Sequence, residues 1–146
     1  MNVKKLKKNK KGFTLVEIIV VLVIIGILMA LAVPAVMKYI NEAAETKVQS
    51  QVRAGYIAAQ SYATNYVGEN PSAEDSAIKQ ALQGDNKAAT NVNKELGLTE
   101  SDDGYIGSID CTVSAKRITS CDITVENSTT VYTATQTKIE KKTTNN

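Results

Sequence analysis

The chain has 146 residues, enough for one small domain, and its 43% hydrophobic and 22% charged residues exclude wholesale disorder. It contains no His and no Trp, and Cys111 and Cys121 are its only cysteines, which excludes His-based triads, Cys–His dyads and nearly all zinc sites. The net charge of +2 depends on six lysines in the first twelve positions; the remainder has eleven basic and fifteen acidic side chains. We therefore expect no enzymatic activity, no cofactor, no metal ion and no nucleic-acid partner.

A lysine-rich leader, residues 1–12, precedes an apolar run with twenty uncharged residues from Ile18 to Met37. This is the general form of an export signal whose basic end stays in the cytoplasm. The run has the length of a membrane span, ~20 apolar residues, and exceeds the ~7–15 of a secretory signal core. The sequence Ala30-Leu31-Ala32 fits the small-x-small pattern of secretory cleavage, which stays an alternative.

Glu17 is the one acidic residue between the leader and this uncharged run. A carboxylate inside an apolar span costs about 2.5–3.5 kcal/mol on insertion scales, so we expect it to have a partner. The alternative is a Glu at the membrane edge whose side chain reaches back to water. The residues around Glu17 favour the first interpretation.

Residues Gly12-Phe13-Thr14-Leu15-Val16-Glu17 follow two lysines and precede an apolar helix with Pro34 inside it. This pattern closely resembles the N-terminus of type IV prepilins. The resemblance implies that a membrane prepilin peptidase cuts between Gly12 and Phe13 and methylates the new amine of Phe13. It implies that Glu17 is the acid needed for methylation and assembly, and that the apolar helix becomes the core of a filament.

The resemblance predicts a structural pilin that passes from the cytoplasmic membrane into a surface filament for adhesion, twitching motility or related functions. Its implied partners are identical subunits, the prepilin peptidase, and the assembly platform with its ATPase. A pseudopilin of a type II secretion or competence system has the same N-terminus and stays an alternative. A signal-anchored surface domain that never polymerises is a third hypothesis, which leaves Gly12, Phe13 and Glu17 unexplained.

Apolar residues continue at spacings of three and four beyond Pro34, which predicts one helix from about Phe13 to Tyr66. Its apolar half covers residues 13–37 and its amphipathic half residues 38–66. Small side chains around Gly55 allow another element to approach closely. The predicted buried stripe comprises Ile40, Ala44, Val48, Val52, Gly55, Ala59, Tyr62 and Tyr66.

Two residues weaken the apolar half of this helix. Gly26 costs about 1 kcal/mol relative to Ala, and Pro34 removes one backbone hydrogen bond. Membrane helices tolerate both, so we expect at most a mild kink in the single subunit. The resemblance implies that the segment from Gly26 to Pro34 unwinds in the filament.

The connecting region, residues 67–104, is polar and contains two short predicted helices. The first begins at Asn70-Pro71-Ser72 and stops at Gly84, and the second spans about Val92 to Leu96. Asp102-Asp103-Gly104 predicts a turn, because adjacent aspartates do not supply the alternating ligands of a calcium loop.

The period changes to two over residues 105–137, which predicts an antiparallel β-meander. Alternation assigns Tyr105, Gly107, Ile109, Cys111 and Val113 to the inner face of one strand, and Thr119, Cys121, Ile123 and Val125 to that of the next. A third β-prone run extends from Thr129 to Thr137. Only the long helix offers an apolar face to cover this sheet, so the fold class is α+β.

Cys111 and Cys121 lie opposite each other if the hairpin turns near Lys116. An even cysteine count in an exported domain favours a disulfide between them. The sequence Asn127-Ser128-Thr129 matches a glycosylation acceptor, a short pattern that arises often by chance. The tail, residues 138–146, is polar and predicted to be disordered.

Overall fold

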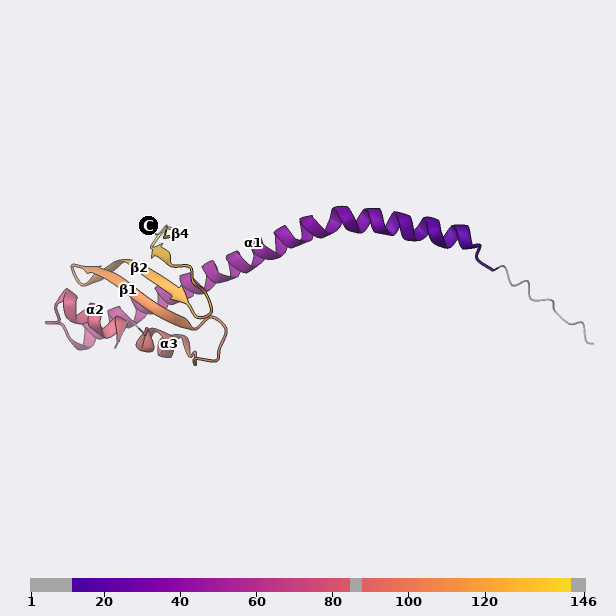
Figure 1. The fold of residues 1–146 in the computed structure, drawn as a ribbon. Coiled ribbons are helices and arrows are strands. Elements are labelled where there is room, and N and C mark those ends of the chain that lie inside the picture. Colours follow the sequence, from indigo (N-terminus) through magenta and orange to yellow (C-terminus); the bar gives the residue numbers. More distant parts are fainter. Residues whose placement is uncertain (1–11, 85–87, 143–146) are drawn as a thin grey trace, which may run out of the picture. The chain divides into compact units, whose positions relative to one another are not determined.

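A computed structural model describes residues 12–84 and 88–142. Within them lie the helices α1 (Leu15–Glu69), α2 (Asp75–Gln83) and α3 (Thr90–Leu96), and the strands β1 (Ile106–Ser114), β2 (Arg117–Val125), β3 (Tyr132–Thr135) and β4 (Ile139–Lys141) (Figure 1). This is the predicted α+β arrangement of a long helix and an antiparallel sheet. Residues 1–11 of the expected leader and residues 143–146 of the expected tail lie outside the described residues.

The chain divides into two compact units, residues 1–42 and 43–146, and α1 contributes residues to both. Every described residue of the first unit is exposed, so α1 buries no face there. The helix is continuous through Gly26 and Pro34, as expected for a single subunit. It extends past the predicted end at Tyr66 to Glu69, and Pro71 then restricts the preceding Asn70 to non-helical backbone.

In the second unit, α1 supplies one side of the hydrophobic core through Val52, Gly55, Tyr56, Ala58, Ala59 and Ala63. The predicted stripe was wrong at its start, because Ile40 and Ala44 are exposed. Only residues from Val48 onward pack against the core. The close approach at Gly55 is confirmed, since a Cβ atom there would lie 2.9 Å from Cδ1 of Ile106.

Helix α2 begins at Asp75, later than the predicted start at residues 70–72. Pro71 and Ser72 form a turn instead, closed by a 3.0 Å hydrogen bond from the Ala73 amide to the Asn70 carbonyl. The predicted stop at Gly84 and the second helix ending at Gly97 are both confirmed. Both glycines have positive φ angles, +58° and +69°, which end a helix without steric cost.

The four strands form one antiparallel sheet in the order β1-β2-β3-β4, the predicted meander with one further strand. In Figure 1, hairpin β1–β2 lies against the C-terminal part of α1, with α2 and α3 near β1. The hairpin turns at Ala115 and Lys116, as predicted, and both have positive φ angles of 50° and 61°. Two consecutive positive φ angles match the right-handed twist of the flanking strands.

Strict alternation was wrong at one end of each long strand, because each contains a bulge. Gly107 is the extra residue in β1, so Ile106 is fully buried in place of Tyr105 and Gly107. Thr119 is the extra residue in β2, so Ile118 is buried and Thr119 is exposed. A bulge shifts the alternation by one residue, which moves all side chains beyond it to the other face.

Strand β4 corrects the prediction that the tail is disordered from residue 138. It pairs with β3, with Ile139 opposite Ala134, and Ile139 packs partly buried against the core. Lys141 forms a 2.8 Å ion pair with Glu45 of α1. The hydrogen bond from Lys141 is the main cause of a lowered pKa at Glu45. Glu45 is distant from Lys141 in the sequence, so this contact gave no local signal.

Candidate functional site

The first turn of α1 is closed by reciprocal hydrogen bonds between Thr14 and Glu17. The backbone N–H of Thr14 and its hydroxyl donate to Oε2 of Glu17 at 2.8 and 2.9 Å. The Glu17 N–H donates back to the Thr14 hydroxyl at 3.3 Å. This is a capping box, in which a Thr and a Glu three residues later satisfy donors that a helix start leaves unpaired.

Sequence reasoning identified Glu17 and missed Thr14. The pattern that would have revealed Thr14 is the spacing Thr-x-x-Glu immediately before an apolar run. Both bonds to the carboxylate use Oε2, so among the described residues Oε1 has no hydrogen-bond donor. Glu17 therefore holds its own helix start and keeps one oxygen for a further donor.

Gly12 and Phe13 lie immediately before this capped start, outside the helix. Phe13 is 84% exposed, and a Cβ atom built on Gly12 would meet nothing within 4 Å. The peptide bond between them is therefore accessible and lies outside regular secondary structure. Three predicted site residues lie within six consecutive positions, and Glu17 contacts Thr14 rather than Phe13.

The predicted segment from Gly26 to Pro34 lies within the apolar part of α1. An 18-residue window of this helix has a mean hydropathy of 3.1, and by length and composition it can cross a membrane. All large apolar side chains from Leu15 to Ile40 are at least 41% exposed. An exposed apolar surface of this extent requires lipid or protein to cover it.

Known proteins with this N-terminus identify the chain. A family profile described as the prokaryotic N-terminal methylation motif matches residues 7–33. The chain is 34% identical to the type IV major alpha-pilin of Moraxella bovis over 114 residues, which are 73% of this chain and 70% of that protein. The chain belongs to the type IV pilin family. The family predicted from residues 12–17 is thereby confirmed.

Two other relatives define the range of the resemblance. The pilin is 36% identical over 90 residues to fimbrial protein Q of Moraxella bovis, which covers 62% of this chain and 48% of that protein. It is 46% identical over 48 residues to type II secretion system core protein G of Pseudomonas aeruginosa, which covers 33% of this chain and 34% of that protein. No solved structure matches the chain.

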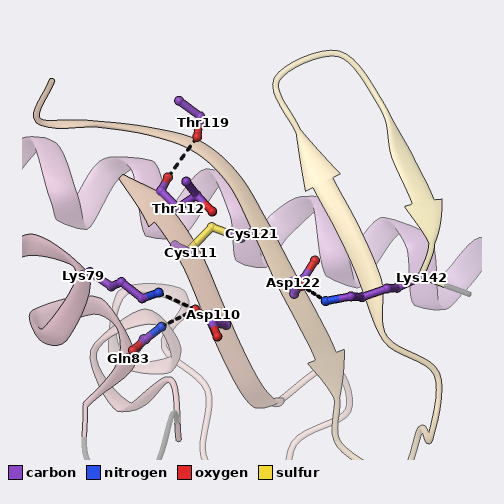
Figure 2. Close-up of polar contacts among 9 residues, drawn as sticks. All are labelled: Lys79, Gln83, Asp110, Cys111, Thr112, Thr119, Cys121, Asp122 and Lys142. Atoms are coloured by element: carbon purple, nitrogen blue, oxygen red, sulfur yellow. Dashed lines mark hydrogen bonds and ion pairs between the residues drawn. A yellow bond between two sulfur atoms is a disulfide. The ribbon is translucent and has the colours of Figure 1, made fainter. Parts of the chain in front are cut away.

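The pilin carries its cysteine pair in the centre of hairpin β1–β2. Cys111 and Cys121 are direct cross-strand partners with Cα atoms 4.0 Å apart, and Figure 2 shows their sulfur atoms joined. Both side chains are fully buried. The predicted opposition of the two residues across the hairpin is therefore correct, and their side chains belong to the core.

Next to this pair, two aspartates face each other on the opposite side of the hairpin. Asp110 and Asp122 are direct cross-strand partners, an arrangement that is destabilising when the charges are uncompensated. Lys79 of α2 lies 2.9 Å from Asp110, and Lys142 contacts Asp122 (Figure 2). The Asp122 hydrogen bond raises the pKa of Lys142. Each carboxylate thus has its own cation, which ties α2 and the chain after β4 to the hairpin.

Proposed function

We propose that this chain is a structural pilin: a membrane precursor cleaved between Gly12 and Phe13, then polymerised with identical copies into a surface filament. The observation that carries the proposal is the similarity to a major pilin over 70% of that protein's length. The exposed apolar part of α1, residues 15–37, supports it, because a polymer of parallel helices would cover this surface. On this proposal the chain has a structural role and no catalysis of its own.

Processing is proposed to occur at the cytoplasmic face of the membrane. The lysines of the leader hold that end of the chain inside, next to the bond after Gly12. The prepilin peptidase removes the leader and methylates the Phe13 amine, and the assembly platform with its ATPase then extracts the subunit. The unpacked backbone around Gly12 gives a protease access.

The proposed role of Glu17 is to set the axial register of the filament. Cleavage creates a positive amine on Phe13, and a staggered neighbour can bring its Glu17 to that amine. An unpaired charge in an apolar core costs several kcal/mol, and a paired one costs much less. The structure supports this role because Oε1 of Glu17 has no donor among the described residues.

A pseudopilin is the second candidate, supported by the similarity to type II secretion system core protein G. That similarity spans 33% of this chain, whereas the similarity to the major pilin spans 73%. The longer match favours the pilus. Unwinding of the segment from Gly26 to Pro34 within the filament is part of the same proposal.

The test is electron microscopy of sheared surface material, combined with the N-terminal mass of its main protein. The proposal expects filaments whose subunits begin at N-methyl-Phe13. Gly12→Leu should leave full-length precursor in the membrane, while the matched variant Gly12→Ala should still be processed. Mature protein that begins at Val33, or processed protein without filaments, would contradict the proposal.

A further inference from the structure

A polar cavity of about 530 Å³ lies in the second unit, between α1 and the turn end of hairpin β1–β2. Neither the proposed cleavage nor the register contact uses it. Tyr56, Ala63 and Ile118 form its buried floor. The polar part of its wall includes Gln60, Thr64, Ser114, Arg117, Thr119 and Gln136. Its volume falls within the ~300–1,000 Å³ typical of small-molecule sites.

The floor of the cavity contains a buried hydroxyl. Tyr56 is 1% exposed, and its phenolic oxygen accepts a 3.0 Å hydrogen bond from the Gln60 amide. Its own O–H proton has no acceptor among the described residues. The Gln60 side-chain oxygen likewise accepts no hydrogen bond within the described chain. One donor and one acceptor are therefore available side by side at the base of the cavity.

The wall of the cavity is positively charged. Lys116 and Arg117 line it, and no carboxylate does. The Lys116 ammonium donates to the Pro71 carbonyl, whereas the Arg117 guanidinium contacts no described acceptor or carboxylate. Asp75 lies near the turn, but its two oxygens accept the N–H groups of Ala115 and Lys116 at 3.1 and 2.7 Å. The Arg117 guanidinium is thus the free cation at this cavity among the described residues.

The turn that presents Arg117 is held in place. Ala115 and Lys116 both have positive φ angles, which cost energy for residues other than glycine. The Asp75 carboxylate compensates by binding both of their N–H groups. A turn fixed in this way positions the wall of the cavity before any ligand arrives, which lowers the entropic cost of binding.

We propose that this cavity binds one acidic sugar unit of a polysaccharide. The sugar carboxylate pairs with the Arg117 guanidinium, and the ring hydroxyls bond to Tyr56, Gln60 and the surrounding hydroxyl groups. Sugar hydroxyls both donate and accept, which matches a wall of hydroxyl and amide side chains. A guanidinium is the preferred partner of a carboxylate because its N–H groups bond both oxygens.

The experiment uses full-length protein dispersed in detergent micelles, so binding is measured independently of filament formation. The probe is a galacturonic acid trisaccharide, and a neutral galactose trisaccharide is its control. Calorimetric titration measures the binding of each. Arg117→Gln removes the cation, and Tyr56→Phe removes only the buried hydroxyl. Lys94→Gln, an exposed cation on α3 outside the cavity, is the matched control. Thermal unfolding of each variant verifies that the second unit is folded.

The inference expects the acidic trisaccharide to bind and the neutral one to bind at least tenfold more weakly. Arg117→Gln and Tyr56→Phe should each weaken binding at least fivefold, and Lys94→Gln should leave it unchanged. Gln60→Glu, which places a carboxylate at the floor, should abolish binding. No binding of the acidic trisaccharide would overturn the inference. Equal binding by Arg117→Gln, or displacement by inorganic phosphate at the same concentration, would overturn it as well.

Discussion

Replacing Glu17 by glutamine separates the two roles that its carboxylate has here. The glutamine oxygen can still accept both hydrogen bonds from Thr14, so the capping box is kept. The negative charge is lost, so the Phe13 amine of a neighbour has no partner in the filament. Glu17→Gln therefore tests the charge, and Thr14→Val tests the cap.

The two expected losses differ widely in size. A lost helix cap costs about 1 kcal/mol, a factor of about five in an equilibrium. Removing one partner of a buried ion pair costs about 3–5 kcal/mol, a factor of about 100 or more. We therefore expect Glu17→Gln to abolish filaments nearly as fully as Glu17→Val. Thr14→Val should reduce them a few fold, and Thr14→Ser should leave them unchanged.

The assay compares the yield of surface filaments with the amount of mature protein in the membrane fraction. Glu17→Val and Glu17→Ala should leave cleavage largely intact and membrane insertion intact or improved, because an apolar span tolerates them better than a charge. Glu17→Asp, whose carboxylate lies nearer the backbone, should be intermediate. Normal filaments from Glu17→Gln, together with a severe defect in Thr14→Val, would refute the register argument in favour of the cap.

Three further predictions concern the second unit. Replacing both Cys111 and Cys121 by Ala should lower its free energy of unfolding by about 3 kcal/mol, the chain-entropy value for a separation of 10 residues. Denaturant titration measures this change, and unchanged stability, or free thiols in unreduced peptides, would contradict the prediction. Gly55→Val should cost about 1–3 kcal/mol, because its side chain overlaps the core atoms that approach there; a thermal melt equal to wild type would refute the close approach. Hydrogen bonds from Thr99 lower the pKa of Asp102 below its ordinary 3.8, so the ionised carboxylate stabilises the folded state. This stabilisation is fully present above pH 3.8 and is lost as the pH falls through the lowered pKa. Asp102→Asn should therefore show a smaller fall in melting temperature between about pH 6 and about pH 2 than wild type, and equal falls would rule the contribution out.

The local sequence was sufficient for most of the elements. The spacing of apolar residues predicted α1 to within three residues at each end, and glycines predicted the ends of α2 and α3. The position of the hairpin turn then placed Cys111 opposite Cys121. These features depend on residues close together in the sequence, so the sequence of one chain, without comparison to relatives, contains the necessary information.

The errors arose where the structure depends on pairing across strands or on contacts between elements. Nothing local marks Thr119 as a bulge, because the extra residue is defined only against the partner strand. Strand β4 pairs with the neighbouring β3 through Ala134, but its contact with Glu45 of α1 joins residues far apart in the sequence. Asn93 is the one buried polar residue of the described core, and its amide bonds both N–H and C=O of Ile106. Such a contact becomes visible only after folding.

The division of α1 between two units has a consequence for the order of events on the proposed pathway. The uncharged run ends at Met37, and its twenty residues match the ~30 Å of a membrane interior. The charges of Lys38 and Glu42, which form an ion pair at 3.7 Å, follow at once and belong at the outer surface. The second unit begins at Ala43 and contains the buried core, so it can fold outside the membrane while the span is still in lipid. On that pathway we expect oxidation of Cys111 and Cys121 to precede extraction. We expect loss of the bond to destabilise the subunit before assembly without changing the proposed charged contact at Glu17.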